Sequence, residues 1–231
     1  MTPLIYLPGM MCDARLFGPQ VAALPGTVYS FGFDETSVQA MAEHLLAFAP
    51  ERFALAGLSM GGIVAMEMLR QAPGRVAGLA LLDTNPLAER DEIKARRGPQ
   101  IEKVRAGKLA EVMRDEMKPN YLAQGPNRQA ILDLCMDMAV CLGPKVFENQ
   151  SIALRDRPDQ TATLRAFTGP ALVLCGREDA LCPVARHALM HALMPQSTLT
   201  VIDGAGHLPT LEQPAQTTAA LRAWLKETDH E

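Results

Sequence analysis

The sequence lacks the features that mark membrane-spanning, secreted and nucleic-acid-binding proteins. No apolar run approaches the roughly 20 residues that cross a bilayer. The first residues carry no basic leader and their short apolar run stops at Pro8, so we expect no signal peptide. A net charge of −4 argues against a general attraction to nucleic acid. The five cysteines are odd in number and form no C-x-x-C pair, which predicts reduced thiols and a cytoplasmic protein.

The remaining composition is typical of one globular domain. The chain has 231 residues, of which 48% are apolar and 21% charged, and this is enough for a substantial core. The sequence contains no internal repeat and no low-complexity linker. We therefore interpret residues 1–231 as a single domain.

Short apolar runs of strand length alternate with helix patterns along most of the chain. A helical spacing covers residues 38–46, and Pro214 opens a final helix. This alternation predicts an α/β fold, with a mostly parallel sheet of about six strands covered by helices on both faces. The strand-like runs are residues 4–7, 27–31, 53–56, 76–82, 171–175 and 199–202.

Residues 86–167 interrupt the alternation, because they contain no convincing strand and several amphipathic helix patterns. The segment has 14 Lys and Arg against 12 Asp and Glu, too small an excess to indicate a nucleic-acid partner. We interpret it as a helical lid over the carboxyl ends of the strands, with an apolar pocket for a small-molecule substrate beneath it. Its methionines should lie mainly in the core, with some facing the substrate: Met113, Met117, Met136 and Met138.

Residues 57–61 fit the pattern G-x-S-x-G, a sharp turn from a strand into a helix that presents a nucleophilic serine. Ser59 must adopt a strained backbone conformation, and Gly57 and Gly61 leave no Cβ to collide in the bend. The N–H of Met60 then opens the helix, where it can meet a developing oxyanion. A plain glycine-rich turn is the alternative, but the order strand, turn and helix favours the nucleophile.

A serine hydroxyl needs a base to take its proton and a third group to orient that base. Asp179 follows one predicted strand and His207 follows the last, so both should lie at the crevice that contains Ser59. The chain order Ser, Asp, His matches serine hydrolases of this topology. Asp83 or Glu178 could supply the carboxylate instead, and His207 could be an ordinary loop histidine.

Together these motifs make the sequence resemble the α/β-hydrolase fold family over nearly its whole length. The resemblance implies Ser59 as nucleophile, His207 as general base and acid, and Asp179 as orienting carboxylate. It also implies that the N–H groups of Met60 and Met10 form the oxyanion hole. The motifs that carry the resemblance are Gly57-Leu58-Ser59-Met60-Gly61, Leu82-Asp83-Thr84-Asn85-Pro86, Gly176-Arg177-Glu178-Asp179 with Pro183, and Gly206-His207 with Glu212 and Pro214.

The chain departs from the family pattern in two places. Many members have His-Gly where this chain has Pro8-Gly9, so the oxyanion loop is anchored differently and Met11 is an alternative to Met10. The chain also starts at what is usually the third strand of the fold, which leaves about six strands.

The resemblance implies a cofactor-independent serine hydrolase that cleaves a carboxylic ester of a small, largely apolar substrate through an acyl-enzyme. Cleavage of a thioester, amide or carbon–carbon bond, perhydrolysis, and a ligand-binding protein without catalysis are the alternatives. His187 and His191 have a spacing that can bind zinc, but no carboxylate or cysteine completes a ligand set, so we expect no metal. Cys12 lacks an adjacent base, and Asp13 is expected to cap a helix.

Overall fold

The computed structural model describes residues 2–29 and 35–228. Six parallel strands form one sheet in the order β2-β1-β3-β4-β5-β6, which confirms the predicted α/β class. The run expected at 27–31 is a strand only over its first two residues, and residues 30 and 31 lie outside the described part. The strands are β1 (Leu4–Leu7), β2 (Thr27–Val28), β3 (Phe53–Leu58), β4 (Val76–Leu82), β5 (Ala171–Gly176) and β6 (Thr198–Ile202).

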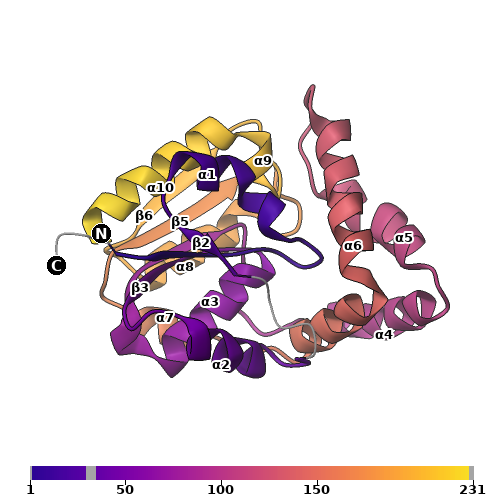
Figure 1. Ribbon diagram of the computed structural model, residues 1–231, viewed down its shortest axis with the longest axis horizontal. Coiled ribbons are helices and arrows are strands. Elements are labelled where there is room, and N and C mark those ends of the chain that lie inside the picture. The colour runs from indigo at the N-terminus through magenta and orange to yellow at the C-terminus, as the bar shows by residue number, and fades with distance from the viewer. Residues whose placement is uncertain (1, 30–34, 229–231) are drawn as a thin grey trace.

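Helices cover both faces of the sheet (Figure 1). One face carries α2 (Val38–Phe48), α3 (Met60–Gln71), α7 (Thr161–Ala166) and α8 (Val184–Leu193). The other face carries α1 (Gly18–Ala23), α9 (Pro209–Glu212) and α10 (Pro214–Thr228). Because each side chain along a strand points to the face opposite its neighbours, these two layers bury two separate apolar clusters. In β3, for example, Leu55 belongs to one cluster and Ala54 and Ala56 to the other.

The strand order reverses next to β1, and this reversal positions the site. The chain runs from β1 to β2 at the edge of the sheet and then crosses back to β3 on the other side of β1. In open parallel sheets, ligands bind in the crevice at the carboxyl ends of the strands beside such a reversal. Three non-glycine residues in the described ranges have positive φ, and each follows a strand at this edge: Met11, Ser59 and Asp83. Strained backbone of this kind is typical of functional sites.

The segment between β4 and β5 is helical and contains no strand. Its helices α4 to α6 lie to one side of the sheet in Figure 1, and the longest of them is kinked at Gly143 (φ 83°), which precedes Pro144. No helix in residues 2–29 and 35–228 is long and apolar enough to cross a membrane. The helical elements of this segment are α4 (Asp91–Arg105), α5 (Leu109–Glu111), η3 (Val112–Met117), η4 (Lys118–Asn120), α6 (Arg128–Arg155) and α7.

Candidate active site

Ser59 occupies a sharp turn between β3 and α3. Its backbone has φ 55° and ψ −115°, a combination that residues other than glycine rarely adopt. A Cβ at Gly57 would collide with the backbone of Gly61, and a Cβ at Gly61 would collide with the carbonyl of Leu7. The two glycines therefore let the turn close tightly against β1, and the serine side chain is pushed out of the sheet.

The end of β4 holds this turn in place. The N–H of Ser59 donates to the carbonyl of Leu82 at 2.9 Å. The hydroxyl of Thr84 donates to the carbonyl of Ser59 at 2.7 Å. A Cβ on Gly62 would lie 2.6 Å from that same hydroxyl oxygen, so this position also requires glycine. Strain at Ser59 is thus balanced by two hydrogen bonds from one neighbouring strand.

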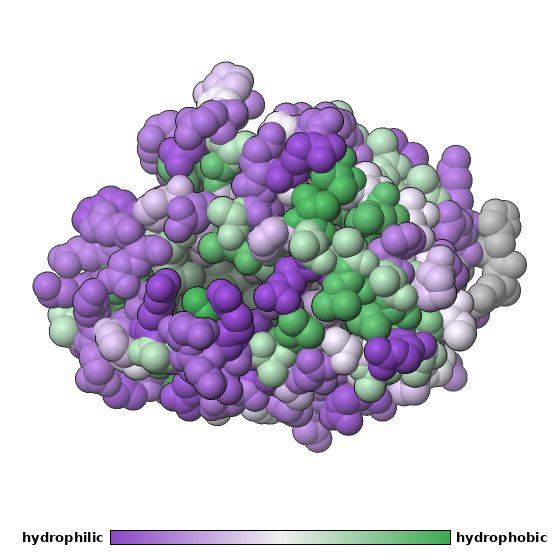
Figure 2. Space-filling view, turned by 180° about the vertical axis from the view of Figure 1, so that it is seen from behind, coloured by the Kyte–Doolittle hydropathy of each residue, from purple (hydrophilic) through white to green (hydrophobic). Residues whose placement is uncertain are grey.

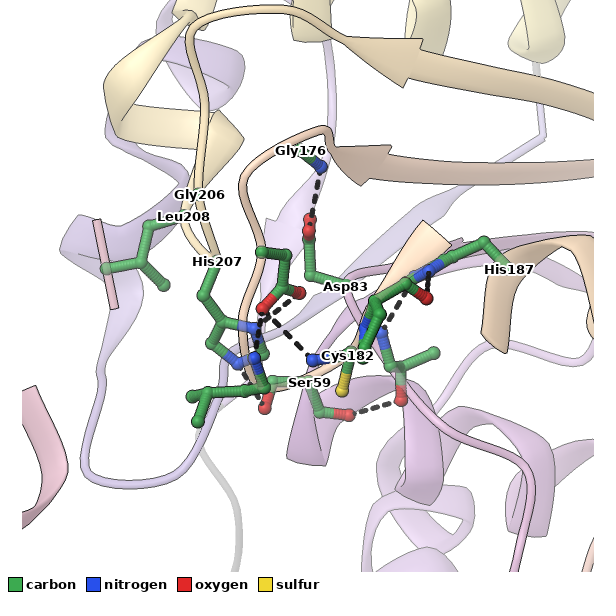
Figure 3. A network of polar contacts seen from close by, with 12 residues as sticks. Ser59, Asp83, Gly176, Cys182, His187, Gly206, His207 and Leu208 are labelled. Carbon is green, nitrogen blue, oxygen red and sulfur yellow. Dashed lines mark hydrogen bonds and ion pairs between the residues drawn. The ribbon is translucent and has the colours of Figure 1, made fainter. Parts of the chain in front are cut away.

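Ser59, His207 and Asp179 form a continuous chain of hydrogen bonds, with the side chains of Ser59 and His207 pointing toward each other (Figure 3). His207 Nε2 lies 2.9 Å from Ser59 Oγ, and His207 Nδ1 lies 2.8 Å from Asp179 Oδ2. Burial alone would raise the pKa of Asp179. The charge and hydrogen bond of His207, together with two backbone N–H groups, outweigh burial and lower that pKa to about 2. Asp179 is therefore an ionised acceptor for a His207 Nδ1–H donor.

Glu212 fixes the loop that carries His207. Its carboxylate accepts hydrogen bonds from the N–H groups of Gly206 and Leu208 at 3.0 Å and of Ala123 at 2.8 Å. Burial raises the pKa of Glu212, and the three N–H donors oppose that effect. The sequence analysis included Glu212 in a motif but gave it no role. The position of Glu212 shortly after His207 was the sequence signal for a role near the histidine. Its contact with Ala123 could not be predicted, because it forms only in the folded chain.

The two alternative carboxylates contact other groups. Glu178 accepts from the N–H of Ala205 at 3.1 Å. One oxygen of Asp83 accepts from the N–H of Gly176 at 2.9 Å, and the other has no hydrogen-bond partner among the described residues. Burial, followed by the negative charge of Asp179, raises the pKa of Asp83 well above its ordinary value. The structure thus places Asp179, and neither alternative, against the histidine.

Met60 and Met10, the residues expected to form the oxyanion hole, both line the cavity that contains Ser59. The N–H of Met60 is the first of α3 and has no partner within the helix. Met10 lines the same cavity as Ser59, whereas the N–H of Met11 already donates to the side chain of Gln150 at 2.9 Å. No hydrogen bond within the described residues engages the N–H of Met10. The geometry therefore favours Met10 over Met11 as the second donor.

The histidines considered for zinc have protein partners instead. His187 Nε2 accepts from the N–H of Thr84 at 3.2 Å, and burial lowers the pKa of His187 to about 4, so this imidazole is neutral. His191 Nδ1 lies 2.8 Å from the hydroxyl oxygen of Ser197. Asp13 accepts from the N–H of Arg15 at the start of a 3₁₀ turn, as expected of a cap.

One other cluster could approach a metal ion, because ligand atoms of Asp179, Cys182 and His207 all lie within 4.8 Å of one another. Asp179 and His207 already bond to each other, and burial raises the pKa of the Cys182 thiol, which opposes the thiolate that a metal requires. The cluster therefore fits a hydrolytic site better than a metal centre. Burial likewise raises the pKa of Cys12, which argues against this thiol as a nucleophile.

A cavity of about 510 Å³ opens onto Ser59 and His207. The apolar part of its lining includes Met10 after β1, Ile63 of α3 and Met117 of η3. Met113 and Met138 are instead wholly buried in the core. The cavity also has a basic part that the sequence analysis missed: Arg90, Arg96, Arg97, Arg157 and Arg186. The surface in Figure 2 is hollowed on the side of α4 to α6, and hydrophilic residues border the hollow.

The sequence matches the model of the Alpha/beta hydrolase family over residues 7–221. The chain belongs to this family. It is 30% identical to the pimeloyl-[acyl-carrier protein] methyl ester esterase of Klebsiella pneumoniae, over 92% of this chain and 89% of that one. It is also 25% identical to the biotin biosynthesis bifunctional protein BioHC of Cellvibrio japonicus, over 95% of this chain and 46% of that longer protein.

Among solved structures, a thermophilic esterase from Thermogutta terrifontis, with malate bound, has a TM-score of 0.88 and 29% identity. The match covers 99% of this chain and 90% of that one. The enol-lactonase of Burkholderia xenovorans has the same TM-score at 19% identity, over 98% and 92% of the two chains, and this similarity concerns the fold alone. Esterases recur among the relatives, so the comparisons support a carboxylic ester hydrolase of the alpha/beta hydrolase family.

Proposed function

We propose that the protein hydrolyses a carboxylic ester of a small molecule through an acyl-enzyme formed on Ser59, without a cofactor. The observation that carries the proposal is the unbroken chain of hydrogen bonds from Ser59 through His207 to Asp179 at a cavity wall. In such a chain the base lies within hydrogen-bond distance of the nucleophile, and the carboxylate orients the base.

In the first half-reaction, Ser59 Oγ attacks the ester carbonyl carbon while its proton passes to His207 Nε2. Asp179 accepts a hydrogen bond from Nδ1–H, which keeps Nε2 free to act as a base and stabilises the imidazolium that forms. The carbonyl oxygen becomes an oxyanion, which the N–H groups of Met60 and Met10 would stabilise. When the tetrahedral intermediate collapses, His207 returns the proton to the departing alcohol and the acyl group remains on Ser59.

In the second half-reaction, His207 takes a proton from water, and the resulting hydroxide attacks the acyl carbonyl. Collapse of this second intermediate returns the proton to Ser59 Oγ and releases the carboxylic acid. The same residues could cleave a thioester or amide, because each has an equivalent carbonyl. An ester is favoured because the Klebsiella relative and the Thermogutta protein are both esterases.

Residues 86–167 would act as the lid of this site. Supporting this role, the cavity that contains Ser59 is lined by residues of α4, by Met117 and Tyr121, and by Leu154 of α6. We retain the cytoplasm as the predicted compartment, because all five cysteines lie in the described ranges and are free.

A fluorophosphonate probe and a panel of p-nitrophenyl esters of graded acyl length test the proposal. The wild-type protein should be labelled and should release p-nitrophenol, whereas Ser59→Ala should lose labelling and several orders of magnitude in kcat. Cys12→Ala is the matched control and should keep both activities. Labelling of Ser59→Ala at the wild-type rate would exclude Ser59 as the nucleophile, and a wild-type protein that reacts with neither reagent would favour the non-catalytic alternative.

A further inference from the structure

The charge of the cavity is opposite to that of the whole protein. The chain carries a net charge of −4, but the cavity wall contains more arginines than carboxylates. A cleft lined by one sign of charge concentrates ligands of the other sign. The charged residues of the wall are Arg90, Arg96, Arg97, Arg157 and Arg186 against Glu89 and Glu116.

The two glutamates do not neutralise these arginines. Glu89 lies between two of them, accepting from Arg97 Nη2 at 2.7 Å and from Arg157 Nη2 at 3.2 Å, so this buried group keeps one positive charge. Arg97 Nε is buried and has no hydrogen-bond partner among the described residues. Glu116 accepts from Lys103 at 2.6 Å, a residue outside the cavity wall, so its charge is already balanced.

Arg186 is the most informative of the remaining arginines. It is half-buried in the first turn of α8, beside Cys182 and Pro183 of the cavity wall. Within the described ranges its side chain has no carboxylate at salt-bridge distance, and the same holds for Arg96. Burial lowers the pKa of Arg157, the charge of Glu89 opposes this effect, and the nearby charges of Arg97 and Arg186 add to it.

Arg97, Arg157 and Arg186 are buried or half-buried and share only the carboxylate of Glu89, so they lack a full counter-charge. Removing a charge from water is costly unless the charge is paired. A guanidinium presents a planar fork of donors that matches a carboxylate in a bidentate geometry. A carboxylate in the cavity would pair with Arg186, which has no carboxylate partner, and would relieve the repulsion among the guanidinium groups of Arg97, Arg157 and Arg186.

We propose that the natural substrate is an anionic ester, in which a free carboxylate lies away from the ester bond and binds the arginines of the cavity. The inference rests on the proposed function, because it assigns one end of the substrate to Ser59. Met10, Ile63 and Met117 would contact an apolar spacer between the two ends. The sequence led us to expect a largely apolar substrate, and under this proposal only its middle part is apolar.

Matched pairs of esters that differ only in charge test the proposal. One set comprises the monomethyl esters of glutaric, adipic and suberic acids and the methyl esters of the corresponding monoamides, followed by methanol release. A second set places the charge on the alcohol side, in acetyl esters of ω-hydroxy acids and of their amides. In at least one set the anion should have a kcat/KM about 10- to 100-fold above that of its neutral partner, as one charged hydrogen-bond pair provides. The advantage should shrink with added salt.

Arg186→Gln and Arg96→Gln should each reduce the ratio of anionic to neutral kcat/KM. Arg165→Gln, which removes an exposed arginine of α7 outside the cavity wall, is the control and should leave the ratio unchanged. Circular dichroism shows whether each variant folds. Equal kcat/KM for charged and neutral partners in both sets, or an anion preference that survives both cavity variants, would overturn this inference and leave ester hydrolysis intact. Failure to cleave any ester would overturn the proposed function as well.

Discussion

Asp83 should keep its proton to a higher pH than an ordinary aspartate does, and this should be measurable as a pH-dependent cost in stability. Its carboxyl group is fully buried at the end of β4, with one N–H donor from Gly176 and no partner for its second oxygen among the described residues. Burial and the neighbouring charge of Asp179 both favour the neutral form. Asparagine has nearly the same shape as protonated aspartic acid and cannot ionise, so Asp83→Asn isolates the effect.

The magnitude follows from proton linkage. The ordinary pKa of an aspartate is 3.8, and the pKa of Asp83 in the folded protein lies well above it. Between these two values the folded state holds a proton that the unfolded state has lost, so wild-type stability falls as pH rises by about 1.4 kcal/mol per unit. The variant does not have this term. The free energy of unfolding of the variant should therefore gain on that of the wild type as the pH rises between these two values.

Urea unfolding of both proteins at pH 5, 6 and 7 measures this difference, because the other titrating groups are the same in the two chains. Asp91→Asn, at an exposed side chain of α4, controls for the loss of one negative charge from the protein. Asp83→Asn should keep most of its kcat, since the hydrogen bonds that join Asp179, His207 and Ser59 do not involve the side chain of Asp83. A difference in stability that stays constant across the three pH values would refute the protonated state.

Three further predictions follow from the geometry. Asp179→Asn should lower kcat roughly 10³- to 10⁴-fold by misplacing the His207 tautomer, measured with p-nitrophenyl esters against the wild type. The pKa of His187 falls from 6.5 to about 4 on folding, so the unfolded chain binds more protons in this window and wild-type stability is lost as pH falls through it. Between pH 6.5 and pH 4, the free energy of unfolding of His187→Gln, measured with urea, should therefore fall by about 3 kcal/mol less than that of the wild type. Met117→Ala should change the ratio of kcat/KM values between short and long acyl esters by an amount equivalent to about 1–3 kcal/mol. Met113 lies in the core, so Met113→Ala should instead lower the free energy of unfolding by about 2–5 kcal/mol.

The residues of the triad could be predicted because their positions follow from the sheet. Ser59 comes directly after β3, Asp179 and His207 lie in the loops that follow β5 and β6, and the carboxyl ends of parallel strands meet at one edge. Short apolar runs identify such strands without knowledge of how the helices pack. The glycines beside Ser59 add a second local signal, since the backbone conformation at that turn requires them.

The remaining parts of the site depend on contacts between distant segments, which no local pattern encodes. Gln150 bonds to the N–H of Met11, 139 residues earlier in the chain. The arginines come from α4, α8 and the loop before α7, and α4 has no apolar stripe that would fix which side chains face the cavity. A dense run of basic residues near the start of α4 was visible in the sequence, but its direction depends on how α4 packs against α6.

The helical segment between β4 and β5, which we propose as the lid, also supports the proposed catalytic centre. The carbonyl of Tyr121 accepts from the N–H of His207 at 2.6 Å, and the N–H of Ala123 donates to Glu212, which holds the same loop. On the opposite side, Gln150 occupies the N–H of Met11 and so leaves Met10 as the free donor beside Ser59. Apart from Arg186 of α8, the arginines that would set selectivity are thus on the same segment as groups that hold the loop of His207. Substitution of the arginines of this segment should leave the position of His207 unchanged. Changes at Tyr121, Ala123 or Gln150 should instead disturb the loops that carry His207 and Met10.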